Sequence, residues 1–495
     1  MIFSYYYFIE KEEHAMTQSD SANILVSKEK IKYFLTAIFL SNIVTMLNTS
    51  TVTISIPTYM KVFHVDVNTV QWVVIGYLLP LGMAMPLAEF LGERFSYRKV
   101  YLISLAMMGI CSLGCALSIN FWMLVFFRFL KGISGGIIIP TTMTLLYRYA
   151  PKNKQAEYLG NCMIFQSIGV LFGPTVAGFI LQMSSWHILF MFNIPLSAIV
   201  YWAAKKSIPS EPPNEHVEKI DFLGCGQVAL GSGLIMLAFS MGESWGWHSL
   251  TFWTCITSGC LLTFFFVVRQ FHTSHPLLNF CVLKYRAFAF AMILQCTIAL
   301  TLGINAILSQ FYFQTGRGFS PATTGLILMF PSIMMLLGNM VTKELHKKGL
   351  RKSLIIGGLL FALLGNLGLC NLTLESSLII VVGCFGMRFF GLSLAQMPLT
   401  NYGLTAVPRE LTGHATSMYN WSKQLVQTIS TNILTVLLSM NMTRYYVQSG
   451  NPLPMNESSL AYKIAAVEAV NTDYTYIAIF LFFSLILSLF ITNKS

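Results

Sequence analysis

The sequence predicts an all-α membrane protein in which fourteen transmembrane helices form two six-helix bundles and a central extra pair. Of its 495 residues, 55% are hydrophobic and only 10% are charged. A soluble domain cannot enclose so much apolar surface. Four stretches without Asp, Glu, Lys or Arg reach the roughly 20 residues that cross a bilayer; they are 100–127, 222–241, 287–315 and 474–492. An internal repeat, described below, supports the division into halves.

The expected spans follow from these apolar runs, taken in chain order. They are 33–58, 70–90, 99–118, 121–147, 158–182, 187–204, 222–241, 251–268, 287–314, 321–342, 353–371, 376–399, 413–440 and 474–492. The predicted divisions are a cytoplasmic tail (1–32), an N-terminal bundle (33–205), a linker with the extra pair (206–286) and a C-terminal bundle (287–495). The last includes a polar outside loop at 441–473. The opening apolar run, 2–9, is too short to span, so we expect a tail or an extension upstream of Met16.

Charge placement orients these spans. The formal charge is +11, but the basic residues lie singly or in short clusters between apolar runs, so membrane topology explains them better than nucleic-acid binding. With a cytoplasmic N-terminus, the inside loops receive most of them, and we expect both termini in the cytoplasm. These inside residues are Arg94, Arg98, Lys99, Arg148, Lys152, Lys154, Lys205, Lys206, Lys219, Arg269, Lys284, Arg286, Lys343, Lys347, Lys348, Arg351, Lys352 and Arg409.

The fourth span of each predicted half contains a matching phrase. Arg128 opens RFLKGIS and Arg388 opens RFFGLS, and a proline follows each, at Pro140 and Pro398. Duplicated halves around a midplane site are typical of secondary transporters, in which one bundle rocks against the other. The ten cysteines never form Cys-x-x-Cys, so neither metal nor disulfide chemistry is expected.

A glycine-rich phrase, GVLFGPTVAG at 169–178, lies in the fifth span. Its glycines are Gly169, Gly173 and Gly178, and Pro174 interrupts the helical hydrogen bonding. Small residues at this spacing also occur in ordinary helix packing. The phrase nevertheless resembles the G-x-x-x-G-P-x-x-G-G antiporter motif of major facilitator exporters, with Ala177 in place of one glycine.

Further phrases resemble the fourteen-span drug:proton antiporters, the EmrB/QacA-like group of the major facilitator superfamily. LNTSTVTISIP at 47–57 is similar to L-D-x-T-I-V-N-V-A-L-P, EFLGERFSYRK at 89–99 to G-x-L-x-D-R-x-G-R-R, and RFLKG at 128–132 to R-x-x-Q-G. WHILFMFNIP at 186–195 and VPRELTG at 407–413 resemble further signatures. The resemblance runs from about residue 35 to 492. It implies the major facilitator fold and export driven by protons.

Two departures from that group affect the expected mechanism. Asn48 stands where the group usually has a membrane-embedded aspartate associated with coupling, and an amide does not titrate. In the loop motif, Glu89 and Ser96 replace glycines and Glu93 replaces aspartate. The resemblance implies a cytoplasmic gating network, whose expected members are Glu93, Arg94, Arg98 and Lys99. An ordinary solvated ion pair is the alternative there.

Ionisable groups inside a bilayer are costly and count as functional candidates. They are Arg128, Lys131, Arg388, Glu89 and Lys423, for the last of which extension to the interface is the alternative. The first four, with Asn48, make up the transport or coupling candidates. For Glu89, extension of the side chain to the interface is the alternative. Because these deep charges include no evident carboxylate other than Glu89 near a helix end, we expect a positively biased central chamber that favours neutral or anionic substrates.

The expected function is a secondary exporter of small amphipathic molecules, powered by protons. The expected partners are that substrate, protons and the lipid bilayer. A periplasmic adaptor protein is a further candidate partner. No Walker-type phosphate loop occurs, so direct use of ATP is not expected. We expect no cofactor and no metal, because His187 and His414 have no second ligand at helical spacing. The alternatives are uptake or export of a specific metabolite or siderophore-like solute, and a membrane enzyme or channel.

Overall fold

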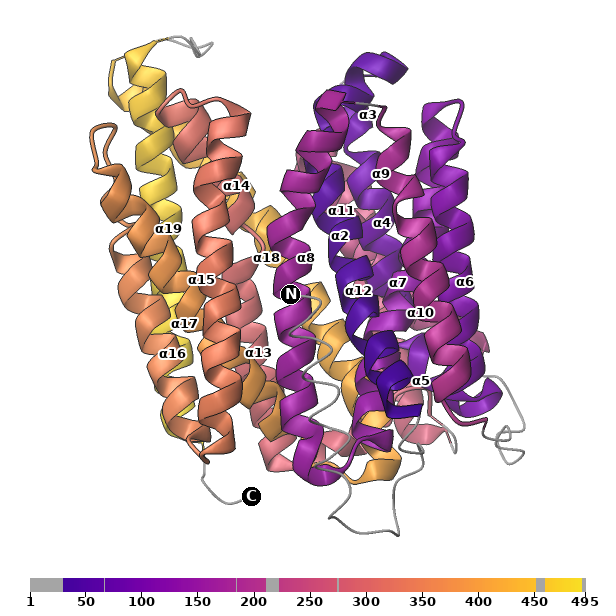
Figure 1. Cartoon of the computed structure of the whole chain (residues 1–495). Helices are drawn as coiled ribbons and strands as arrows, with labels where there is room; N and C mark the ends of the chain where they lie inside the picture. Colours follow the sequence, from indigo (N-terminus) through magenta and orange to yellow (C-terminus); the bar gives the residue numbers. More distant parts are fainter. Residues whose placement is uncertain are drawn as a thin grey trace.

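The computed structural model describes residues 30–65, 67–183, 185–210, 222–273, 276–450 and 459–491, and this part is helical without strands (Figure 1). The first half comprises α2 (Ile31–Phe63), α3 (Val67–Val70), α4 (Trp72–Ala84), α5 (Leu87–Phe95), α6 (Tyr97–Ala116), α7 (Phe121–Tyr149), η3 (Lys152–Lys154), α8 (Gln155–Met183), α9 (His187–Met191) and α10 (Asn193–Ser207). A middle pair follows, α11 (Phe222–Trp245) and α12 (Leu250–His272).

The second half begins after the short turn η4 (Phe280–Lys284). It comprises α13 (Arg286–Leu302), α14 (Asn305–Gln310), the π-helical turn η5 (Phe311–Gly316), α15 (Pro321–Lys347), α16 (Arg351–Leu367), α17 (Leu378–Thr405), η6 (Arg409–Leu411), α18 (Thr412–Gln448) and α19 (Leu460–Leu489). The predicted tail before residue 30 and the loop around Lys219 lie outside the described residues.

The all-helical membrane fold is confirmed, whereas the count of fourteen spans is not. The described residues contain 12 helices long and apolar enough to cross a membrane, or 13 when α4 and α5, which meet at 57°, are taken as one broken span. The expected span at 353–371 corresponds to α16, which has only 17 residues. At 1.5 Å per residue it is about 26 Å long, at the lower limit for a spanning helix.

The expected outside loop at 441–473 is wrong for most of its length. Helix α18 continues to Gln448 and α19 begins at Leu460. The segment is rich in polar residues, but its apolar residues also recur at helical spacing. Met442 and Tyr446, four residues apart, are both buried, and so are Ala466 and Val470. Of the segment 441–473, only residues 451–458 lie outside the described residues.

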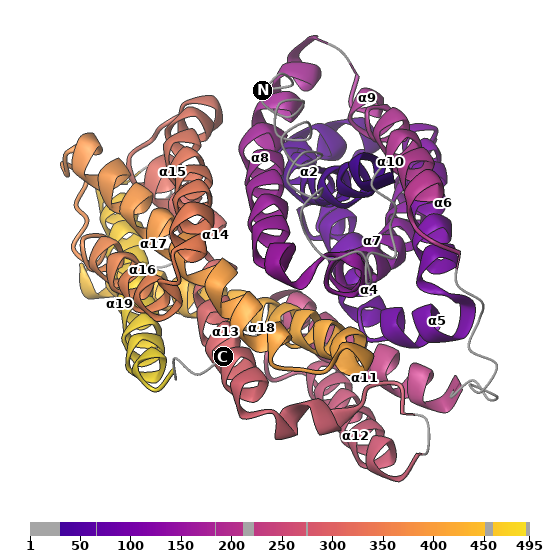
Figure 2. The same cartoon turned by 60° about the horizontal axis from the view of Figure 1, so that its bottom comes forward.

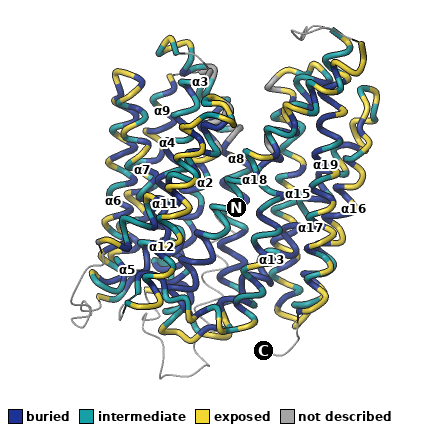
Figure 3. Tube along the Cα trace, turned by 180° about the vertical axis from the view of Figure 1, so that it is seen from behind, coloured by how far each residue is buried: buried dark blue, intermediate teal, exposed yellow. Residues whose placement is uncertain are grey.

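The two halves diverge toward one end and meet at the other (Figures 1 and 3). The end where they meet carries the loops and helix termini with the predicted inside charges, and we call it the basic end; its residues include Arg94, Lys152, Lys205, Lys347, Arg351 and Arg409. The largest buried apolar cluster runs through the first half and reaches α17 and α18 there, at Met397 and Met418, whereas the second largest is confined to residues 291–491. The halves are therefore packed together at the basic end.

The middle pair is central in the sequence but lies to one side of the molecule (Figure 2). Helix α11 packs against α4 of the first half and α18 of the second. Helix α12 packs on α11 and exposes large apolar side chains, among them Trp253, Phe264 and Phe271. Such a surface suits contact with lipid chains.

Candidate functional site

Polar contacts between the two halves lie at the basic end. The shortest joins the hydroxyls of Thr144 on α7 and Thr416 on α18, 2.6 Å apart. Three more within the described residues are Lys347 Nζ to Glu157 Oε1 at 2.7 Å, Asn339 Nδ2 to Ser167 Oγ at 2.8 Å, and Tyr147 OH to Asn401 Oδ1 at 3.3 Å. The Asn339–Ser167 contact lies near the middle of α8, whereas the other three contacts join elements near their basic-end termini, so the structure is closed at that end.

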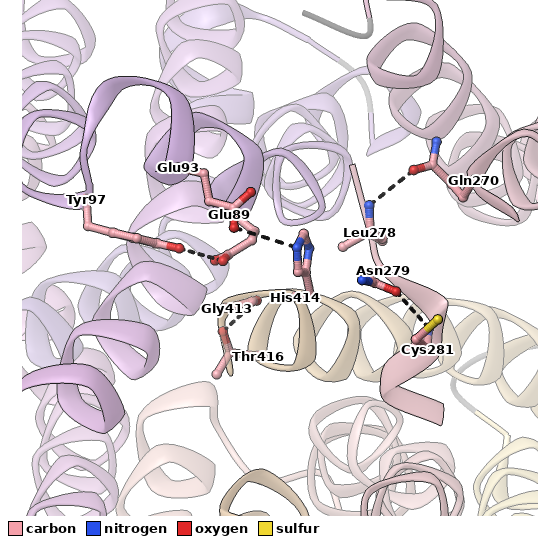
Figure 4. Close-up of polar contacts among 10 residues, drawn as sticks. All are labelled: Glu89, Glu93, Tyr97, Gln270, Leu278, Asn279, Cys281, Gly413, His414 and Thr416. Carbon is pink, nitrogen blue, oxygen red and sulfur yellow. Dashed lines mark hydrogen bonds and ion pairs between the residues drawn. The ribbon is translucent and has the colours of Figure 1, made fainter. Parts of the chain in front are cut away.

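Glu89 lies between the two halves at this closure, beside Gly413 and His414 of α18 (Figure 4). It is 1% exposed, and its Oε1 accepts a hydrogen bond of 2.5 Å from the hydroxyl of Tyr97. The carboxylate lies against Gly413 in the first turn of α18, where any Cβ would overlap it. Negative charge is favourable beside a helix N-terminus. A glycine at 413 is therefore what allows Glu89 of one half to reach the α18 helix of the other.

A second acid, Glu93, extends the same contact. Its Oε1 lies 3.8 Å from Nε2 of His414, and ligand atoms of Glu89, Glu93 and His414 all lie within 4.8 Å of one another (Figure 4). Two carboxylates and an imidazole could hold a divalent ion. The expectation of no metal considered spacing along single helices, and that spacing does not reveal a group assembled from α5 and α18.

The contacts described for the expected gating residues lie both within the first half and between the halves. Glu93 faces His414 across the halves, whereas Arg98 donates a 2.7 Å hydrogen bond to the backbone carbonyl of Lys205 within its own half. The backbone amide of Lys99 bonds the hydroxyl of Ser96 at the start of α6, and Arg94 lies in the last turn of α5. The contact of Glu93 with His414 therefore extends the predicted network to the second half.

Arg128 and Lys131 lie inside the first half. Arg128 is 1% exposed, donates from Nε to the carbonyl of Val73, and lies over the ring of Tyr77 at 4.9 Å. Lys131 is 0% exposed, and its Nζ lies 5.2 Å from the ring centre of Phe190, without a hydrogen-bond partner among the described residues. The first half thus buries two cations, one of which has no polar partner.

Arg388 occupies the corresponding place in the second half. It is 0% exposed and lies over the ring of Tyr474 at 5.7 Å. It donates from Nη1 to the side-chain oxygen of Asn305 and from Nη2 to the carbonyl of Thr301 at 2.8 Å. These hydrogen bonds connect α17 to the last turn of α13 and the first residue of α14.

The expected positively biased chamber between the halves is not what these residues form. Arg128, Lys131 and Arg388 face the interiors of their own halves. Nor is a deep carboxylate missing: Asp473 is 0% exposed within α19, and neither of its oxygens has a hydrogen-bond partner among the described residues. Sequence reasoning missed it by placing residue 473 in a loop. The predicted preference for neutral or anionic substrates thus loses its basis.

Asn48 and the antiporter-like glycines also belong to the first half. Asn48 is 1% exposed and donates from Nδ2 to the carbonyl of Val44 at 2.8 Å, so its amide faces the bundle interior. A Cβ at Gly169 would lie 2.7 Å from that of Met46, so Gly169 permits α8 to pack closely on α2. Gly178 has no such neighbour within 4 Å, Gly173 is buried, and the side chain of Pro174 lies outside the described residues.

Two cavities occur in the described part of the chain, and only the larger lies at the closed basic end. One, of about 1060 Å³, lies between the halves and is lined by basic residues, including Lys152 and Arg351. The other, of about 360 Å³, lies between the middle pair and α18 and is lined by apolar residues such as Phe239 and Trp253. Sequence spacing could not reveal the first, because its lining comes from several separate elements.

Comparison with known proteins agrees with this architecture. A model of the Major Facilitator Superfamily matches residues 38–431. The uncharacterized MFS-type transporter YhcA of Bacillus subtilis is 28% identical, over 81% of this chain and 76% of its own. The multidrug resistance protein Stp of Mycobacterium tuberculosis is 27% identical (78% and 72%), and the lincomycin resistance protein LmrB of Listeria monocytogenes is 25% identical (78% and 82%).

Solved structures show the same fold at low identity. The human organic anion transporter TETRAN superposes with a TM-score of 0.61 at 13% identity, covering 92% of this chain and 99% of its own. The proton:xylose symporter XylE superposes with a TM-score of 0.62 at 13% identity, covering 92% and 95%. The chain therefore belongs to the Major Facilitator Superfamily and is a multi-pass membrane transporter, not an enzyme.

Proposed function

We propose that this protein is a secondary active exporter of small amphipathic compounds, driven by proton antiport. The main support for this proposal is that the two helical halves touch through polar contacts at one end and diverge at the other. Alternating access requires such an arrangement. The antiporter-like phrase at 169–178 favours export, and so do relatives named for multidrug and lincomycin resistance. The likeness to the fourteen-span drug:proton group supports the same assignment.

The proposed orientation places the basic end in the cytoplasm, with both termini there and the protein in the cytoplasmic membrane. Basic loops remain preferentially on the cytoplasmic side. In this orientation the structure corresponds to a state closed to the cytoplasm. The halves that move are the proposed bundles 33–205 and 287–495, and Glu89 stabilises the closed state by its contact with Gly413.

Lys131 is the proposed carrier of the coupling proton. Asn48 cannot carry it, because an amide does not titrate. Burial without a polar partner favours the uncharged form of an amine, and a change in its surroundings during transport would favour the charged form. The amine lies on the same helix as Arg128, whose side chain bonds α4. Proton release and substrate binding would then favour different states of the two halves.

A transport assay with purified protein in liposomes tests the proposal. Compounds from a chemically varied panel are loaded on the side of the basic end, and a pH gradient is imposed with and without a protonophore. The proposal expects gradient-dependent transport of at least one lipophilic compound away from the basic end, abolished by the protonophore. Comparison of wild type with Arg128→Ala, Lys131→Gln and Asn48→Asp tests the coupling residues; transport of every compound independent of the gradient would contradict antiport.

Uptake of a specific solute is the second candidate, because a proton:xylose symporter shares this fold. The two candidates differ in direction. Labelled compound entering from the divergent end along with protons would favour uptake, whereas movement from the basic end against protons would favour export.

A further inference from the structure

The cavity at the basic end has an unusual charge for a space between two packed halves. It measures about 1060 Å³, and six Lys or Arg side chains line it against a single carboxylate, Glu157. The six are Lys152, Lys154, Lys343, Lys347, Arg351 and Arg409. Lys152 and Lys154 belong to the first half, in η3, and the other four to the second half, so the positive charge is contributed from both sides.

Membrane topology alone does not account for this grouping. Basic loops are sufficient to orient a membrane protein, wherever on that face they lie. Basic residues elsewhere at this end use protein acceptors: Lys206 donates to the hydroxyl of Tyr33 at 2.6 Å, and Lys352 to the carbonyl of Leu489 at 2.9 Å. In the cavity, Lys347 and Lys343 share Glu157, at 2.7 and 3.4 Å. Glu344 outside the lining lies 3.7 Å from Lys347, and these two carboxylates cannot balance six cations at short range.

Three of the lining cations have no acceptor within the part of the chain that the structure describes. These are Lys152, Arg351 and Arg409, for which no side-chain hydrogen bond or ion pair occurs there. His346 also lines the cavity, is 6% exposed, and its Nδ1 lacks a hydrogen-bond partner among the described residues. The wall therefore presents unused donors around a space large enough for a bound anion.

We propose that this cavity binds the phosphate of an anionic phospholipid headgroup, which bridges the two halves at the basic end. Phosphate oxygens accept several charge-assisted hydrogen bonds, and Lys and Arg are their usual donors. Tyr285, Leu404 and Val407 line the same space beside the charges, so a glycerol backbone meets an apolar wall. The cavity lies at the ends of spanning helices. Lipid headgroups are expected at such ends, and basic pockets between helices bind anionic lipids there.

This site goes beyond the proposed export function and can be tested without transport. Purified wild type in neutral detergent is titrated with phosphatidylglycerol, with phosphatidylcholine and with inorganic phosphate. Bound lipid is counted by native mass spectrometry, and thermal unfolding is followed in parallel. The expected result is retention of phosphatidylglycerol and a rise in unfolding temperature that phosphatidylcholine does not produce.

Matched variants locate the binding. Lys152→Gln with Arg351→Gln removes one cavity charge from each half, whereas Lys284→Gln with Lys348→Gln removes two exposed charges at the same end outside the cavity. We expect the first pair to weaken phosphatidylglycerol binding roughly ten-fold and the second pair to leave it near wild type. Equal weakening by both pairs, or by neither, would overturn the proposal. If inorganic phosphate raises the unfolding temperature as much as the lipid does, the occupant is a free anion and the lipid assignment fails.

Discussion

The two halves use the same repeat position in opposite ways. In the first half, Lys131 follows Arg128 by three residues; in the second, Gly391 follows Arg388 by three. Lys131 holds a buried amine without a polar partner among the described residues. At Gly391 a Cβ would collide with the backbone nitrogen of Ala362, so α17 and α16 are in backbone contact. One half has a titratable group where the other has tight packing.

The arginines of the repeat show the same difference. Arg388 has two acceptors on the α13 and α14 region, Thr301 and Asn305, whereas Arg128 has one among the contacts seen, the carbonyl of Val73. In the proposed mechanism, the second half is a rigid support and the first half contains the group that changes charge.

The largest expected effect follows Lys131→Met. Removing the amine should reduce uphill, gradient-driven transport at least ten-fold, because no proton can be carried at this position. The same change should raise the unfolding temperature, since a buried unpaired polar group costs about 1–3 kcal/mol. Exchange of labelled for unlabelled substrate, which needs no net proton movement, should remain. Uphill transport at the wild-type rate would show that Lys131 is only structural.

The next effect compares the two arginines. Arg388→Met should destabilise the protein by about 3 kcal/mol, because two hydrogen bonds to a charged donor are lost and Asn305 keeps an unpaired oxygen. Arg128→Met should cost about half as much. Unfolding in detergent by thermal melts of both variants gives the comparison. A larger loss for Arg128→Met would reverse the assignment of the rigid half.

Gly391→Ala tests the backbone contact directly. The added Cβ meets backbone atoms of α16, which cannot rotate away, so a loss of about 1–3 kcal/mol is expected. Gly383→Ala on the same helix is the matched control, because nothing lies within 4 Å of its Cβ. Similar melting temperatures for both variants would show that α16 and α17 pack less tightly than described.

The smallest effect concerns the ion pair between the halves. Lys347 has a side chain that is 43% exposed, and exposed pairs contribute about 0.2–1 kcal/mol. Lys347→Gln should therefore increase opening at the basic end only several-fold, as measured by distances between spin labels. An effect as large as that of Lys131→Met on transport would contradict this ranking.

Much of the fold was predictable because long apolar runs in the sequence indicate membrane helices. The repeat-related arginines were likewise found from RFLKG and RFFG, and both proved to be buried. Boundaries failed where polar residues lie on one face of a helix, as in α19, so Asp473 was misplaced. For α16, the apolar stretch predicted a span to residue 371, but the helix ends at Leu367. An apolar stretch therefore does not determine where a helix ends.

The candidate site was less predictable because it depends on contacts between distant segments. Nothing near Glu89 in the sequence indicates that Gly413 lies against it, and Glu93 and His414 are brought together only by packing of α5 on α18. Charge alone also misled: three deep cations suggested a positive chamber, but side-chain direction places them inside the halves.

Cross-linking of the basic end tests the central claim most directly. With the native cysteines replaced, Thr144→Cys and Thr416→Cys place two sulfurs where hydroxyls lie 2.6 Å apart, close enough for a disulfide. If the halves must separate here during each cycle, oxidation will stop transport in liposomes and reduction will restore it. A cross-linked protein that transports at the uncross-linked rate would contradict alternating opening of the two halves.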